Sequence, residues 1–271
     1  MLNLFKEIFT YEFMIRAMIV GGLVSLCSAL LGVSLVLKKY SMIGDGLSHV
    51  AFGALAVAVA CNIAPLYIAI PIVIAAAFIL LHISENSKIK SDAAIGLIST
   101  VSIAIGVITI SLSKGMNSDL NSYMFGSILA MSLSDVILSI ALSVCVLIVF
   151  VLFYNKMFAV TFDENFAKAT GIKANRFKII LSILTAITIV IGMRMMGTML
   201  ISSLIIFPSL TAMCVCKTFK SVVVTSGIVS VICLFFGIII SYVYAIPTGA
   251  SIVITNAIMF VLFRLTKKTF A

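Results

Sequence analysis

An aspartate and a histidine four residues apart form the most chemically informative pair in this sequence. Asp45 and His49 lie in the stretch SMIGDGLSH, residues 41–49. If this stretch is helical, a spacing of four places both side chains on one face. A carboxylate oxygen and an imidazole nitrogen are both ligands for first-row divalent metal ions. The pair predicts a metal site, but the same spacing also fits an Asp45 that caps a helix over residues 46–62 and a His49 that hydrogen-bonds to a neighbouring helix.

A short charged segment forms the second candidate site. The sequence DENFAKATG occupies residues 163–171, within the largest polar insert, residues 156–178. Acidic residues lead, Lys168 follows, and Gly171 stands where a C-terminal cap belongs, so the pattern predicts a short helix. Such a helix between two membrane spans is either a plain amphipathic connector or a docking element for a cytoplasmic motor protein. The residues assigned to docking are Asp163, Glu164, Phe166, Ala167 and Gly171.

A proline interrupts one of the later apolar runs. Pro208 stands in the sequence IFPS and falls within a predicted membrane helix. Proline has no amide hydrogen and frees a carbonyl one turn earlier, so Pro208 should kink that helix. Kinks occur at gates and in passive bundle helices alike, and the sequence leaves both interpretations open.

The composition requires that these residues be placed in a membrane. The 271 residues are 63% hydrophobic and only 10% charged, whereas soluble domains carry roughly 25% charged residues. This chain has too few charged residues to form the water-exposed surface of a soluble protein. We therefore expect an all-α polytopic bundle that forms a single transmembrane domain over residues 1–271.

Nine apolar runs approach or exceed the length that a membrane helix needs, about 20 residues. Because two of them are short, eight to ten spans are compatible with the sequence. The nine runs are 13–37, 46–62, 65–83, 93–113, 134–155, 177–195, 198–216, 220–241 and 250–264.

The basic residues predict the orientation of the bundle. With nine spans, fourteen of the 18 Lys and Arg residues fall on one side and four on the other. Short cytoplasmic loops are enriched in Lys and Arg, so the N-terminus is expected outside and the C-terminus in the cytoplasm. The net charge of +9 is thereby explained by topology, and nucleic acid is not expected as a partner.

Two further segments carry weaker patterns. Apolar residues at helical spacing before residue 13 predict a short helix lying on the outer membrane surface. Residues 118–133 are moderately apolar but interrupted by Asn, Gly and Ser. This segment is expected to be a re-entrant or interfacial piece.

Several catalytic and binding motifs are absent from the sequence. It contains no Gly-x-x-x-x-Gly-Lys-Ser/Thr phosphate loop, no His-Glu-x-x-His and no Gly-x-Ser-x-Gly. The six cysteines lie in or beside apolar runs, without the spacing of a disulfide framework or a zinc site. We therefore expect no enzymatic activity and no permanently bound cofactor. Active transport would draw on a separate ATPase or on an ion gradient.

Six motifs in the same order resemble the ABC-3 family, the permease subunits of bacterial ABC importers for zinc, manganese or iron(II). The likeness runs from the first span to the last. The motifs are LLG through KK followed by IGDGLSH (30–49), DAAIG (92–96), DLNSYMFG (119–126), DENFAKATG (163–171), G through LIIFP (197–208) and YAIPTG (244–249). The sequence departs from the family at Gly46, where Ala is common, and at Ala250, where a second proline-like turn is common.

This resemblance implies a fold, partners and a cargo. A second copy of the chain would enclose a central pathway, two cytoplasmic ATPase subunits would supply energy, and an extracytoplasmic metal-binding protein would deliver the ion. The location would be a bacterial cytoplasmic membrane. Asp45 and His49 would form a transient, under-coordinated metal site in the pathway. The residues from Gly192 to Pro208 are more similar to zinc permeases than to manganese permeases.

Two hypotheses from other classes remain open on sequence grounds. A secondary transporter would show duplicated halves with broken helices, and no duplication is visible. A membrane scaffold would need no transport pathway. The helix expected at residues 163–171 discriminates between these classes, because only a permease coupled to a motor requires it.

Overall fold

The computed structural model describes residues 11–86, 91–112 and 133–270, and within these ranges the regular elements are helices. The bounds in chain order are α2 Glu12–Leu37, α3 Ser41–Ala60, α4 Pro65–Asn86, α5 Ser91–Leu112, α7 Leu133–Leu152, α8 Tyr154–Phe162, α9 Glu164–Ala169, α10 Ala174–Met196, α11 Thr198–Val215, α12 Phe219–Tyr244 and α13 Thr248–Phe270. All but α8 and α9 are long and apolar enough to cross a membrane, which gives nine candidate spans in the described part of the chain.

These helices confirm the predicted all-α membrane bundle and its nine runs, with two informative differences. The second span begins at Ser41 and not at residue 46, so it includes Asp45. In addition, a single residue, Gly197, separates α10 from α11. Gly197 has φ +82° and ψ 168°, a conformation that is essentially restricted to glycine. Its neighbours Met196 and Thr198 are 1% and 5% exposed, so this reversal of the chain lies inside the protein.

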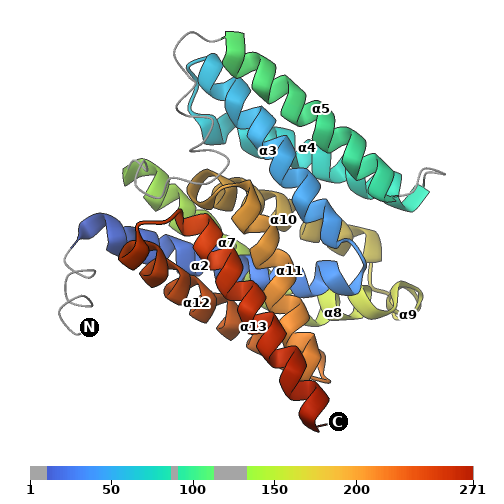
Figure 1. Ribbon diagram of the computed structural model, residues 1–271. Coiled ribbons are helices and arrows are strands. Elements are labelled where there is room, and N and C mark those ends of the chain that lie inside the picture. The colour runs from blue at the N-terminus through green and yellow to red at the C-terminus, as the bar shows by residue number, and fades with distance from the viewer. Residues whose placement is uncertain (1–10, 87–90, 113–132, 271) are drawn as a thin grey trace.

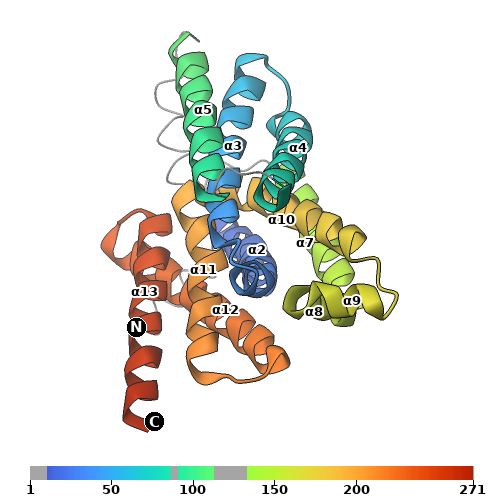
Figure 2. The same cartoon turned by 90° about the vertical axis from the view of Figure 1, so that its right-hand side faces the viewer.

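The helices form three groups (Figures 1 and 2). Helices α3, α4 and α5 stand together on one side, α12 and α13 on the other, and α2, α10 and α11 lie between them. The short helices α8 and α9 lie beside the first turns of α10, at the end where α2 gives way to α3. This end is called the basic end here. The described lysines and arginines at it include Lys38, Lys39, Lys156, Lys168, Lys173, Arg176, Lys178, Lys217 and Lys220.

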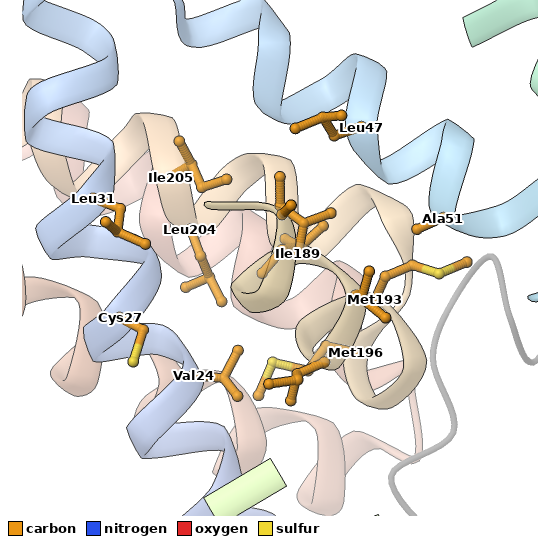
Figure 3. Close-up of a cluster of buried hydrophobic side chains, with 14 of the residues drawn as sticks. Val24, Cys27, Leu31, Leu47, Ala51, Ile189, Met193, Met196, Leu204 and Ile205 are labelled. Atoms are coloured by element: carbon orange, nitrogen blue, oxygen red, sulfur yellow. The ribbon is translucent and has the colours of Figure 1, made fainter. Parts of the chain in front are cut away.

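The centre of the bundle is an apolar cluster to which most of the described helices contribute. Figure 3 shows Leu31 of α2, Leu47 of α3, Met193 of α10 and Leu204 of α11 in this cluster. Each of these side chains is at most 1% exposed. In lipid, burial of apolar surface gives no drive for helix association, so close van der Waals packing must hold these helices together.

Glycines permit the closest helix approaches. A Cβ on Gly32 of α2 would lie 2.1 Å from the carbonyl oxygen of Ile205 in α11. A Cβ on Gly53 of α3 would lie 2.5 Å from the carbonyl oxygen of Ser102 in α5. Both contacts are with backbone, which cannot move aside as a flexible side chain can. The positions of α11 and α5 relative to α2 and α3 therefore depend on these two glycines.

The contact at Gly53 leads to a stability prediction. Gly53→Ala should destabilise the protein by about 1–3 kcal/mol through overpacking, despite the gain of up to about 1 kcal/mol from replacing a helical glycine. The matched control is Gly96→Ala on α5, because a Cβ on Gly96 meets nothing within 4 Å. Thermal unfolding in detergent should show a lower midpoint for Gly53→Ala alone, and equal midpoints for the two variants would contradict the packing argument.

Candidate functional site

Asp45 and His49 lie on one face of α3, as predicted. Because α3 begins at Ser41, Asp45 is in the second turn of the helix and cannot be its N-cap. The capping hypothesis for Asp45 is therefore wrong. The His49 Nε2 lies 3.7 Å from Asp45 Oδ2, and the Asp45 and His49 side chains are 41% and 28% exposed.

A serine from α11 fixes the Asp45 carboxylate. The Ser202 hydroxyl donates to Asp45 Oδ1 at 2.9 Å, which leaves Oδ2 on the side toward His49. Ser202 was not among the sequence candidates. It lies 157 residues from Asp45 in the chain, and serine is common in this sequence, so no local pattern could have indicated it.

The pair has the chemistry of a weak cation site. One carboxylate oxygen and one imidazole nitrogen can both coordinate a divalent ion. In the part of the chain that the structure describes, no group of three or more His, Cys, Asp or Glu side chains gathers around a common point. Two ligands per chain therefore favour transient over stable binding of a metal ion. Water or another chain would have to complete the coordination.

The exposure of this pair conflicts with a lipid environment. Asp45 lies four residues inside α3, so it is about 6 Å along the helix from its first residue. Ionisable side chains at membrane depth face protein or water because contact with lipid is costly. Met199 lies three residues before Ser202, on the same side of α11, and is 54% exposed. We therefore expect this face of the chain to contact protein or water and not lipid.

The predicted helix at residues 163–171 is present as α9, with both caps formed. The Asp163 carboxylate accepts from the Phe166 amide at 2.9 Å, which is an N-cap. At the other end the amide of Gly171 donates to Lys168 O and the amide of Ile172 to Ala167 O, at 3.1 and 2.9 Å. These two hydrogen bonds, with Gly171 at φ +82°, form a Schellman motif.

An ion pair attaches α9 to α10. Glu164 contacts Lys168 of its own helix at 2.7 Å and Lys178 of α10 at 2.9 Å. Burial would raise the pKa of the Glu164 carboxyl, but the hydrogen bonds and charges of the two lysines outweigh it, so the pKa is lowered. Lys178, the last residue of the polar insert at residues 156–178, is only 7% exposed.

The two apolar residues of α9 have opposite environments. Ala167 is fully buried and packs in a small cluster with Val160 of α8 and Ala174 of α10. Phe166 is 61% exposed. A groove of about 950 Å³ runs along α9, between it and the end of α4, and His82, Glu164, Lys168 and Lys178 are among its lining residues. The segment is thus held rigidly and presents an aromatic side chain and a polar groove to a partner.

Pro208 lies inside α11 and is buried. It removes the amide that would otherwise bond to the Leu204 carbonyl. The next residue, Ser209, donates its hydroxyl to Ile205 O at 3.0 Å and lies 3.4 Å from Ala29 O of α2. The proline therefore stands beside a contact between α11 and α2, and a gating role for it stays a prediction.

An ion pair that the sequence did not indicate lies between two spans. The Arg194 guanidinium contacts the Asp135 carboxylate at 2.6 Å, with the two side chains 19% and 15% exposed. The ion pair joins α10 to the first turn of α7.

Three sequence predictions fall outside the described residues. They are the surface helix before residue 13, the re-entrant piece at residues 118–133, and the DLNSYMFG motif at residues 119–126, whose structure is not described.

Comparison with known proteins decides the family. The profile of the ABC 3 transport family matches residues 10–267. The chain belongs to this family. It is a permease of an ABC importer for divalent metal ions, a multi-pass membrane subunit that performs no catalysis itself. This membership sets aside the secondary-transporter and scaffold hypotheses, and it implies an ATPase and a binding protein as partners.

Individual relatives divide between metals. The high-affinity zinc uptake system membrane protein ZnuB of Haemophilus influenzae is 31% identical over 252 residues, 93% of this permease and 97% of the relative. The manganese import system permease protein ScaB of Streptococcus gordonii is 32% identical over 250 residues, 92% and 90% of the two chains. A chain in the structure of PsaBC from Streptococcus pneumoniae in complex with Fab superposes with a TM-score of 0.87 at 29% identity, covering 96% of this permease and 94% of that chain.

The ion pair at Glu164 predicts a pH-dependent stability. A lowered folded-state pKa means that the contribution is fully present above the ordinary glutamate pKa of about 4.3 and is lost as the pH falls through the lowered value. Glu164→Gln should cost about 1–2 kcal/mol at pH 7, because Lys178 is buried while water screens Glu164.

The measurement is the thermal midpoint from pH 7 down to pH 3 in detergent. The difference between wild type and Glu164→Gln should shrink below about pH 4.3. Lys168→Gln is the control, since Lys168 is 57% exposed and its loss should have little effect. A pH-independent difference would show that the carboxylate charge is not what stabilises α9.

Proposed function

We propose that this permease imports zinc in preference to manganese or iron(II), and that the ion passes the Asp45–His49 pair. The observation that carries the proposal is a carboxylate and an imidazole on one face of a membrane helix, oriented by Ser202. Both side chains are partly exposed at a depth where lipid contact is costly. Imidazole is a more usual ligand for zinc than for manganese, which is better suited by carboxylate, carbonyl and water oxygens.

We propose that a second copy of this chain packs against the face that carries Asp45, His49 and Ser202. A two-fold axis beside Asp45 would bring a second Asp45 and His49 to the pathway, giving up to four ligands without any additional residue type. Such a site is complete only between the two copies. It opens as soon as the copies move apart, which is what transit requires.

The proposed orientation in the membrane rests on the basic end. Enrichment in Lys and Arg favours a cytoplasmic location for this end, so α9 would meet the ATPase subunits. Phe166 and the adjoining groove supply the contact surface.

Motion of α9 would reach the metal pair through consecutive rigid contacts. Glu164 attaches α9 to Lys178 of α10, and Gly197 alone joins α10 to α11. Helix α11 carries Ser202, which holds Asp45. Pro208 leaves the carbonyl one turn earlier without its helical hydrogen bond, and it is the proposed point at which α11 bends.

Metal uptake by vesicles containing the permease, its ATPase and its binding protein tests the site. Asp45→Asn with His49→Ala should abolish ATP-driven uptake while leaving the complex assembled. Ser202→Ala should reduce uptake by less, because it only releases the Asp45 carboxylate. In competition, zinc should displace manganese and iron(II).

The control for this test is Asp92→Asn, an exposed acidic residue in the first turn of α5, which should leave uptake unchanged. Full uptake by the Asp45/His49 double variant would make the pair structural and remove the proposed path. Preferred uptake of manganese would keep the path but reverse the metal assignment.

Coupling is tested separately through α9. Gly171→Pro cannot keep φ at +82°, and Glu164→Lys places a third positive charge beside Lys168 and Lys178. Both variants should hydrolyse ATP with at least tenfold less metal moved per ATP. The control is Lys217→Glu, a charge reversal at an exposed basic-end residue outside α9. Unchanged coupling in both α9 variants would eliminate the docking role.

A further inference from the structure

A pocket separate from the metal pair lies between α8, the turn after α9 and the start of α10. Its volume is about 310 Å³. Lys156 of α8 lines one side, and Lys173, Arg176 and Phe177 at the start of α10 line the other. The backbone of residues 170–172 closes it. Gly171 also caps α9, but Lys156, Lys173, Arg176 and Phe177 have no part in the proposed transport path.

The pocket collects positive charge that the protein does not neutralise. In the described part of the chain, none of Lys156, Lys173 and Arg176 forms an ion pair with a carboxylate. The two acidic residues of the same segment are already engaged, because Asp163 caps α9 and Glu164 binds Lys168 and Lys178. All three side chains are exposed, so together they offer an accessible binding surface for an anion from outside the chain.

Aromatic rings hold the Lys156 ammonium at this place. Its Nζ lies 5.7 Å from the ring centre of Phe153 and 5.5 Å from that of Phe177, and the two rings pack edge to face at 5.5 Å. Cation–π contacts of this kind stabilise the charge over the rings. The cation is thereby positioned before any ligand arrives.

The depth of the pocket points to a lipid. Lys156 comes four residues after Leu152, the last residue of the α7 span, and Arg176 is the third residue of α10. The cations therefore lie at the level where two spans leave the membrane. Val151 and Leu152, at the adjoining end of α7, are 67% and 72% exposed, which offers apolar surface to acyl chains at the same level.

We propose that this pocket binds the phosphate headgroup of an anionic phospholipid. Basic pockets between spans at the membrane boundary are suited to such headgroups, and a cavity of this size admits one phosphate with its glycerol. A bound lipid would bridge α8 to α10 and so brace the base of α9. The same cations could instead meet free phosphate or an acidic surface of the ATPase, and the experiment separates these ligands.

The test measures binding of short-chain lipids to the purified complex of the permease with its ATPase, in detergent. Dioctanoyl phosphatidylglycerol should bind and raise the thermal midpoint. Dioctanoyl phosphatidylcholine and glycerol 3-phosphate should bind at least tenfold more weakly, the first for lack of net charge and the second for lack of acyl chains. Each cation contributes about a fivefold change in affinity, so Lys156→Gln/Lys173→Gln/Arg176→Gln should weaken binding on the order of 100-fold.

The matched control removes the same charge from the same end of the bundle but outside the pocket. It is Lys217→Gln/Lys220→Gln/Arg264→Gln, whose residues are exposed, and it should leave lipid affinity within about twofold. An equal loss of lipid affinity in both triple variants would show that general surface charge causes the binding and would overturn the proposal. Equal binding of glycerol 3-phosphate would assign the pocket to a free anion. Loss of ATPase assembly in the pocket variant, with lipid binding unchanged, would assign it to the ATPase.

Discussion

The cost of placing a charge inside a membrane governs most of this structure. Few ionisable residues lie at membrane depth, and three carboxylates at or near that depth have polar partners. Asp135 pairs with Arg194, Glu164 pairs with Lys178 at the boundary, and Asp45 takes a hydrogen bond from Ser202 beside His49. The first pair joins two helices and is largely shielded, whereas in the second only Lys178 is buried. The Asp45 side chain, in the third group, remains 41% exposed. We interpret this exposure as a sign that the group serves function and not stability.

Close helix packing connects that site to the rest of the bundle. Helix α11 carries Ser202 and is fixed against α2 where Gly32 removes a side chain and against α10 through the buried Gly197 turn. Helix α10 follows the segment that contains α9, and Lys178 of α10 binds to α9. A displacement of α9 therefore acts on a small number of stiff elements before it reaches Asp45. The interior transmits strain because it is packed as densely as a crystal.

The sequence predicted the features that are local in the chain. Apolar run lengths predicted nine spans, and the position of acids, Lys168 and Gly171 predicted α9 with its caps, since capping depends on residues within one turn. It misplaced the start of α3 because Ser41 to Gly44 carry no strong helix signal, and this error left Asp45 as an apparent cap. Ser202, Lys178 and the Arg194–Asp135 pair were missed for a different reason. Their partners lie as far as 157 residues away, and only the packing of the helices brings them together.

The claim on which the account depends is that the face carrying Asp45, His49 and Ser202 is covered by a second copy of the chain. A photo-crosslinking amino acid at Met199, which is 54% exposed on this face, should yield a covalent dimer when the complex is irradiated in membranes. The same amino acid at Val151, 67% exposed at the end of α7, should yield lipid adducts and no dimer. Lipid adducts at Met199 with dimers at Val151 would contradict the account, because the metal pair would then face the bilayer.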